Sequence, residues 1–183
     1  YKRQMPINVK SLALEKVEEM KSSNNEYYKQ LQYVKTLIKF PWSSPNDDII
    51  FHELNKDISK RKFYISSIEN DLKKLTFGHI EAKKSLLQII GKWITNPVSG
   101  GSVISLVGPP GVGKTLLAKS ISQAMKIPFS QITLGGQNDG ELLHGHGYTY
   151  SGSQPGMIIK KMIDTGKSRC ILYFDELDKA CSK

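Results

Sequence analysis

The sequence predicts an α/β fold in which a parallel sheet with flanking helices follows a helical arm. Residues 1–75 carry apolar side chains at helical spacing. From residue 102, short apolar runs alternate with helical segments in the order strand, helix, strand, helix, strand, which is typical of a parallel sheet. With 183 residues, the chain has room for one domain and an extension. We expect an arm or linker over residues 1–75 and an α/β domain over residues 76–183.

The arm begins with two predicted helices. Residues 9–21 and 26–40 each carry an apolar stripe, and the polar residues 22–25 separate them. The stripe of the second helix is Tyr27, Leu31, Val34 and Ile38. Pro41 ends this helix, because proline disfavours helical geometry in the residue before it. Phe40-Pro41-Trp42 then forms an apolar corner, which the polar turn 43–47 follows.

A longer helical stripe covers residues 49–75, and we expect an interruption near Lys60. Residues 76–79 form a short joint before a helix over residues 80–95, and residues 97–101 form a loop.

The second half predicts three strands, at residues 103–107, 129–134 and 170–174. Helices are expected at residues 114–125 and at residues 157–165, the latter ending at Gly166.

Charge and composition narrow the function classes. The net charge is +9, with the excess mainly in the first half as short runs such as residues 60–62. Solvated helix faces are favoured over a nucleic-acid surface, because no aromatic residues interleave with these charges.

No apolar run approaches the roughly 20 residues of a membrane span, and no secretory leader is visible. Cys170 and Cys181 fit neither a disulfide framework nor a zinc pattern, which favours reduced intracellular thiols.

A glycine-rich loop between the first strand and its helix matches the phosphate-binding pattern G-x-x-x-x-G-K-[ST]. It consists of Gly108, Pro109, Pro110, Gly111, Val112, Gly113, Lys114 and Thr115. The glycines allow backbone N–H groups to surround phosphate oxygens at the N-terminus of a helix. Lys114 would contact the β- and γ-phosphates of ATP, and Thr115 would ligate Mg²⁺. The strand and helix that the pattern requires are both predicted here.

An apolar strand that ends in an acidic pair follows about sixty residues later. Asp175 would hold Mg²⁺ through its water shell, and Glu176 would orient and polarise the attacking water. The second carboxylate argues for hydrolysis and against an ATP-binding protein that has lost it. His144 and His146 form an H-x-H pair without further ligands nearby, so ordinary loop histidines are favoured over a zinc site.

The phosphate loop and the acidic pair resemble those of AAA+ ATPases, and the flanking residues resemble the Lon family of ATP-dependent proteases. The resemblance rests on Leu134 to Asp139, Gly145-His146, Thr149 to Gly156, Asp175 to Lys179, Phe40-Pro41-Trp42 and Phe77 to Lys83. It covers the chain, with gaps, from about residue 9 to the end, and segment 48–75 is longer than the family pattern.

The resemblance implies a homo-hexamer that hydrolyses ATP with Mg²⁺, unfolds damaged proteins and threads them to a serine protease chamber. Tyr150 matches the aromatic residue of the family's pore loop that grips the substrate, and Ser151 stands where an aliphatic residue is usual. Gly147 and Tyr148 replace two arginines; Tyr148 is either a second gripping ring or a packed loop residue. Phe77-Gly78 matches the part that covers adenine, with a core aromatic as the alternative for Phe77.

The family's sensor strand, trans-acting arginine, helical lid and Ser–Lys dyad would all lie after Lys183. In the AAA+ order, the strand that neighbours the phosphate-loop strand also comes later, so residues 103–107 would lack parallel partners. We therefore expect residues 1–183 alone to be a poor ATPase and no protease. The alternative class is an AAA+ remodeller or helicase-type motor without a peptidase. A cytoplasmic location is expected, with the mitochondrial matrix or the peroxisome as alternatives.

Overall fold

The computed structural model describes residues 5–22, 26–43, 49–96, 101–135, 141–145 and 153–180. Its contacts divide the chain into two compact units, Tyr1–Ser44 with Ser130–Lys183, and Pro45–Phe129. Among the described residues, no helix is long and apolar enough to cross a membrane.

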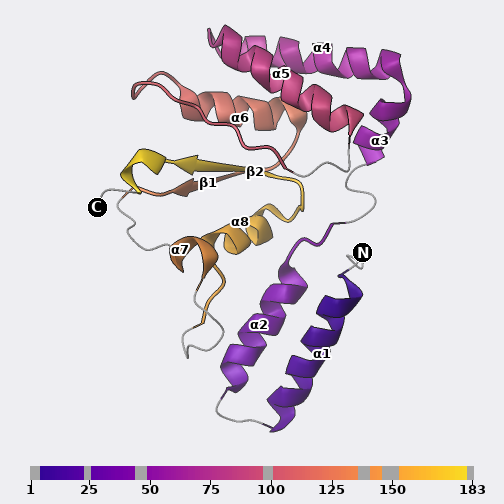
Figure 1. The fold of residues 1–183 in the computed structure, drawn as a ribbon, viewed down its shortest axis with the longest axis vertical. Coiled ribbons are helices and arrows are strands. Elements are labelled where there is room, and N and C mark those ends of the chain that lie inside the picture. The colour runs from indigo at the N-terminus through magenta and orange to yellow at the C-terminus, as the bar shows by residue number, and fades with distance from the viewer. Residues whose placement is uncertain are drawn as a thin grey trace. The chain divides into compact units, whose positions relative to one another are not determined.

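The first unit begins with a pair of helices, α1 (Ile7–Ser22) and α2 (Tyr27–Lys39), which pack side by side (Figure 1). The predicted stripe of α2 is only partly correct, because Val34 is buried while Ile38 is 64% exposed. Gln30 of α2, which is not part of the predicted stripe, is buried as well. Its Nε2 donates a 3.0 Å hydrogen bond to the Glu19 carboxylate of α1. Pro41 is fully buried after the end of α2, as expected for the apolar corner.

The remainder of the first unit is a two-stranded parallel sheet with short helices (Figure 1). Strand β1 (Phe129–Thr133) pairs with β2 (Ile171–Asp175), and Leu134 N–H continues the ladder with a 2.9 Å bond to the Asp175 carbonyl oxygen. Helix α8 (Met157–Thr165) ends at Gly166, whose φ of 68° is left-handed. The sequence did not predict α7 (Glu141–His144) or the 3₁₀ turn η1 (Leu177–Lys179), which are both very short.

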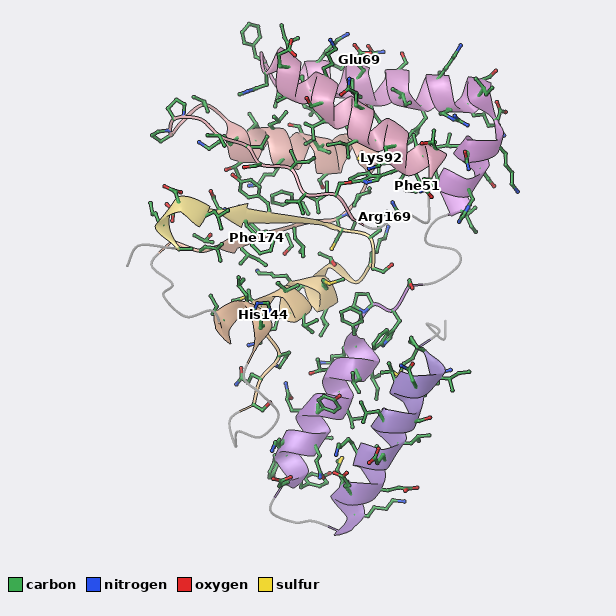
Figure 2. The ribbon with its side chains drawn as sticks, in the orientation of Figure 1. Phe51, Glu69, Lys92, His144, Arg169 and Phe174 are labelled. Carbon is green, nitrogen blue, oxygen red and sulfur yellow. The ribbon has the colours of Figure 1, made fainter. Side chains whose placement is uncertain are left out.

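The described part of the second unit consists of four helices and the glycine-rich loop that leads into the last of them. It contains α3 (Ile49–Lys56), α4 (Ile58–Leu75), α5 (Ile80–Thr95) and α6 (Lys114–Met125). The expected interruption falls at Asp57, whose carboxylate accepts hydrogen bonds from the N–H groups of Ser59 and Lys60 and so caps α4. Helix α4 packs on both α5 and α6 (Figure 1). Figure 2 shows Phe51 of α3 on the side that faces α5, and this side chain is only 5% exposed.

The strand predicted at residues 103–107 is absent, which corrects that expectation. These residues have no regular secondary structure, and Val103 and Val107 are 99% and 94% exposed. A strand needs a neighbour to pair its backbone groups, and the described part of the chain offers none to this segment. The helices expected on either side of it are confirmed as α5 and α6. The domain boundary near residue 75 stays a prediction.

Candidate functional site

The phosphate loop is a turn that leads directly into α6. Gly111 and Gly113 have φ values of 79° and 86°, which lie in the left-handed region that favours glycine. A Cβ on Gly111 would meet no atom within 4 Å, so conformation rather than space requires glycine there. Gly113 is the N-cap of α6, and its carbonyl oxygen accepts the first helical bond from Leu117 N–H. The loop therefore places backbone N–H groups at a helix N-terminus, where anions are favoured.

Lys114 lies on the first turn of α6 and folds back over the loop. Its Nζ donates hydrogen bonds of 2.7 Å and 2.8 Å to the carbonyl oxygens of Gly108 and Pro109. The ammonium is thus held within the turn, where a phosphate group would find it. Thr115 follows on the same turn and is half-buried.

The joint between α4 and α5 lies beside this loop. His79 Nε2 would be 3.6 Å from a Cβ on Gly113, so the imidazole is next to the N-cap of α6. Gly78 and His79 both have left-handed backbones, with φ values of 71° and 54°. Phe77 is fully exposed, so the alternative that it is a core aromatic is wrong for this structure. No sequence pattern predicted His79 as a neighbour of the phosphate loop.

Asp175 is the last residue of β2, and its carboxylate is oriented by three donors. Oδ2 accepts a 2.9 Å hydrogen bond from Gln131 Nε2, a side chain of β1. Oδ1 accepts from Glu176 N–H at 3.0 Å and from the Tyr173 hydroxyl at 3.4 Å. The sequence placed Asp175 at the strand end but did not predict Gln131 as its partner.

Glu176 follows with a left-handed backbone (φ 57°), which is unusual for a residue other than glycine. Its Oε1 accepts a hydrogen bond from Lys179 Nζ on η1. This bond and the charge of Glu176 raise the pKa of the Lys179 ammonium above its ordinary value. Lys179 therefore stays charged at neutral pH. Lys179 was predicted only as part of the family resemblance, without a role.

The loop that we expect to contact the substrate contains Tyr150, and its two ends come together at Gly145 and Gly156. Tyr150 and Ser151 lie outside the described residues, as do Gly147 and Tyr148. Gly145 and Pro155 form an isolated antiparallel bridge on either side of them. A Cβ on Gly156 would be 2.1 Å from the Leu143 carbonyl oxygen, so the two ends of the loop meet backbone to backbone.

A cavity of about 360 Å³ lies in the first unit between α2 and the base of this loop. Its walls include Tyr33, Leu37, Phe40, Trp42, His144 and Pro155. His144, labelled in Figure 2, ends α7. Within the described ranges, no group of three His, Cys, Asp or Glu side chains is placed to hold a metal ion. His146 lies outside the described residues, so the interpretation of the two histidines as ordinary loop residues stays a prediction.

Mg²⁺ prefers oxygen ligands and keeps several of its waters. Thr115 and Asp175 supply a hydroxyl and a carboxylate, and the carboxylate is already oriented by Gln131. Each of these groups, taken by itself, is an oxygen ligand of the kind that Mg²⁺ binds. The two residues belong to different units, and each fits the role within its own surroundings.

The chain is similar to known ATPases and proteases. The profile of the ATPase family associated with various cellular activities (AAA) matches residues 104–183. A Lon protease homolog of Acanthamoeba polyphaga mimivirus is 44% identical over 98% of this chain, which covers 18% of that protein. The Lon proteases of Malacoplasma penetrans and Paraburkholderia phytofirmans are 35% and 34% identical over 95% and 96% of the chain. The chain spans about a fifth of the length of these relatives, 21% and 20% of the latter two. On this similarity over nearly its whole length, the chain belongs to the Lon family and carries part of its AAA ATPase domain.

Proposed function

We propose that this chain is the ATP-binding and ATP-hydrolysing part of a Lon-like ATP-dependent serine protease. The observation that carries the proposal is the left-handed glycine turn at the N-terminus of α6, with the Lys114 ammonium held inside it. A turn of this kind binds phosphate through backbone N–H groups and a lysine. The Asp175-Glu176 pair at the end of β2 supplies the second half of the chemistry.

In the proposed reaction, Lys114 binds the β- and γ-phosphates and neutralises charge on the transferred group. Thr115 and Asp175 would hold Mg²⁺, which supplies electrostatic stabilisation of the phosphate oxygens when bound. Glu176 orients the attacking water and accepts its proton. Phe77 and Gly78 are proposed to contact the adenine, since the exposed Phe77 ring lies two residues from His79, which borders the phosphate loop.

For the whole protein, we propose a homo-hexamer that unfolds damaged proteins and threads them to a peptidase. Tyr150 and Ser151 are the proposed substrate contacts. The Lon protease names of the relatives support this proposal.

Glu176→Gln in the full-length protein tests the hydrolytic role. Because the substitution removes the base and leaves the phosphate loop intact, ATP binding is retained and turnover falls by about 10²- to 10⁴-fold. Asp178→Asn is the matched control, since Asp178 is an exposed acid on the same turn. Turnover that is equal in Glu176→Gln and in the unmodified protein would contradict the assignment.

A further inference from the structure

The carboxylate of Glu176 occupies the space that a side chain at position 135 would fill. Gly135 lies just after β1, beside the end of β2. A Cβ placed on Gly135 would be 1.9 Å from Glu176 Oε2 and 2.9 Å from its Cδ. Any residue larger than glycine would therefore displace this carboxylate.

The second oxygen of the same carboxylate is also held. Lys179 Nζ donates to Oε1, while Oε2 lies against Gly135. At the backbone, Glu176 N–H donates to Asp175 Oδ1. Asp175 thus holds the main chain of Glu176, and Lys179 holds its side chain. The Glu176 carboxylate therefore has a defined direction.

We propose that Gly135 is a positioning residue for Glu176: its missing side chain forms a notch that receives the carboxylate, and Lys179 holds the carboxylate in it. The proposal rests on the proposed function, in which Glu176 is the base for ATP hydrolysis. A base must lie within hydrogen-bond reach of the proton that it abstracts, so its direction sets the rate of the chemical step. ATP binding depends on the phosphate loop and is expected not to depend on Gly135.

Gly135 can be substituted without straining the backbone. Unlike Gly111 and Gly113, it does not have a left-handed φ. The three atoms nearest to an added Cβ all belong to the Glu176 side chain, and the closest two are at its flexible end. Gly135→Ala therefore moves the carboxylate and leaves the backbone in place.

The experiment measures the ATP turnover of Gly135→Ala in the full-length protein. We expect kcat to fall by about 10- to 100-fold, as for a reacting group displaced by about 1 Å, with the KM for ATP within about twofold. Gly91→Ala is the control, because a Cβ on Gly91 of α5 meets no atom within 4 Å. In a Glu176→Gln background, Gly135→Ala should cause no further loss, because its effect passes through the base. Lys179→Met should lower kcat in the same way. Lys179→Arg, which keeps the positive charge, should have a kcat close to that of the unmodified protein.

Three results would overturn the proposal. The first is an unchanged kcat in Gly135→Ala. The second is a further loss of turnover in the Glu176→Gln background. The third is a changed circular dichroism spectrum or a raised KM, since either would show that the substitution disturbs more than one carboxylate. If Gly135→Ala is fully active while Glu176→Gln is inactive, only the role of Gly135 is refuted. An unmodified protein without ATP turnover refutes the proposed function itself.

Discussion

Gln131 on β1 donates a 2.9 Å hydrogen bond from Nε2 to Oδ2 of Asp175 at the end of β2, and so one strand orients the acidic group of the other. The other oxygen, Oδ1, accepts from the Glu176 backbone N–H. With both oxygens engaged, the carboxylate cannot rotate freely about its terminal torsion. A Mg²⁺ ligand that is fixed before the ion binds loses less conformational freedom on binding.

Replacement of Gln131 by leucine is therefore expected to raise the Mg²⁺ concentration that ATP turnover requires. A hydrogen bond to a charged, partly exposed group contributes about 1 kcal/mol, which corresponds to about a fivefold higher Mg²⁺ concentration at half-maximal rate. The measurement is ATP turnover over a Mg²⁺ titration, with Gln88→Leu on the exposed face of α5 as control. An identical titration curve for both variants would show that Gln131 does not act through Asp175.

Gly156→Ala should disturb the base of the substrate loop. The added Cβ would lie 2.1 Å from the Leu143 carbonyl oxygen and 2.6 Å from Gly145 N, and backbone atoms cannot rotate away as a side chain does. Overpacking of this kind costs about 1–3 kcal/mol. Hydrogen exchange of residues 141–145 and 153–156 should accelerate, while the exchange of α5 stays the same. Gly91→Ala is again the matched control, and equal exchange in both variants would show that the loop base tolerates a side chain.

Helical periodicity and the phosphate-loop pattern were sufficient to predict the longer helices, but not α7 or η1. Each stripe in residues 49–75 and 80–95 has an apolar face that other helices bury, and Ile68, Leu72 and Ile90 are among the most buried side chains. The strand at residues 103–107 was wrong as a structural prediction, because an apolar run forms a strand only when another strand pairs with it. Ile38 likewise follows helical spacing but is exposed, since periodicity does not show where a partner helix ends.

The sequence predicted the groups that we propose for the chemistry but not those that orient them. Lys114 belongs to the phosphate-loop pattern, and Asp175 and Glu176 end a later apolar strand, so sequence patterns alone predict all three. Gln131 and Lys179 act on Asp175 and Glu176 through contacts that depend on strand register and on a left-handed turn. His79 reaches Gly113 only because α4 and α5 turn beside the phosphate loop. None of these contacts leaves a spacing signal in a single sequence.

Cys170 is expected to react slowly with iodoacetamide at neutral pH. Burial raises the pKa of its thiol, and a hydrogen bond with Thr165 only partly opposes this effect. Because the thiolate is the nucleophile, a raised pKa means less reactive thiolate at pH 7 and a half-maximal rate at a higher pH than for an exposed cysteine. Mass spectrometry of the peptide that contains Cys170 measures the rate against pH, with urea-unfolded protein as control. A native rate equal to the unfolded rate at every pH would contradict this expectation.

Tyr150→Ala should uncouple ATP use from protein degradation. If Tyr150 grips the substrate, its removal leaves the phosphate loop and the Asp175-Glu176 pair intact but transmits less force to a folded substrate. The number of ATP molecules hydrolysed for each folded substrate degraded should therefore rise by at least about tenfold, whereas degradation of an unstructured peptide should change much less. Tyr148→Ala is the matched comparison, because Tyr148 is the other tyrosine of the loop. If the ratio of ATP hydrolysed to substrate degraded rises only in Tyr150→Ala, this ring is the one that grips the substrate. If the ratio rises in both variants, both rings grip it. An unchanged ratio in Tyr150→Ala would show that Tyr150 does not contact the substrate.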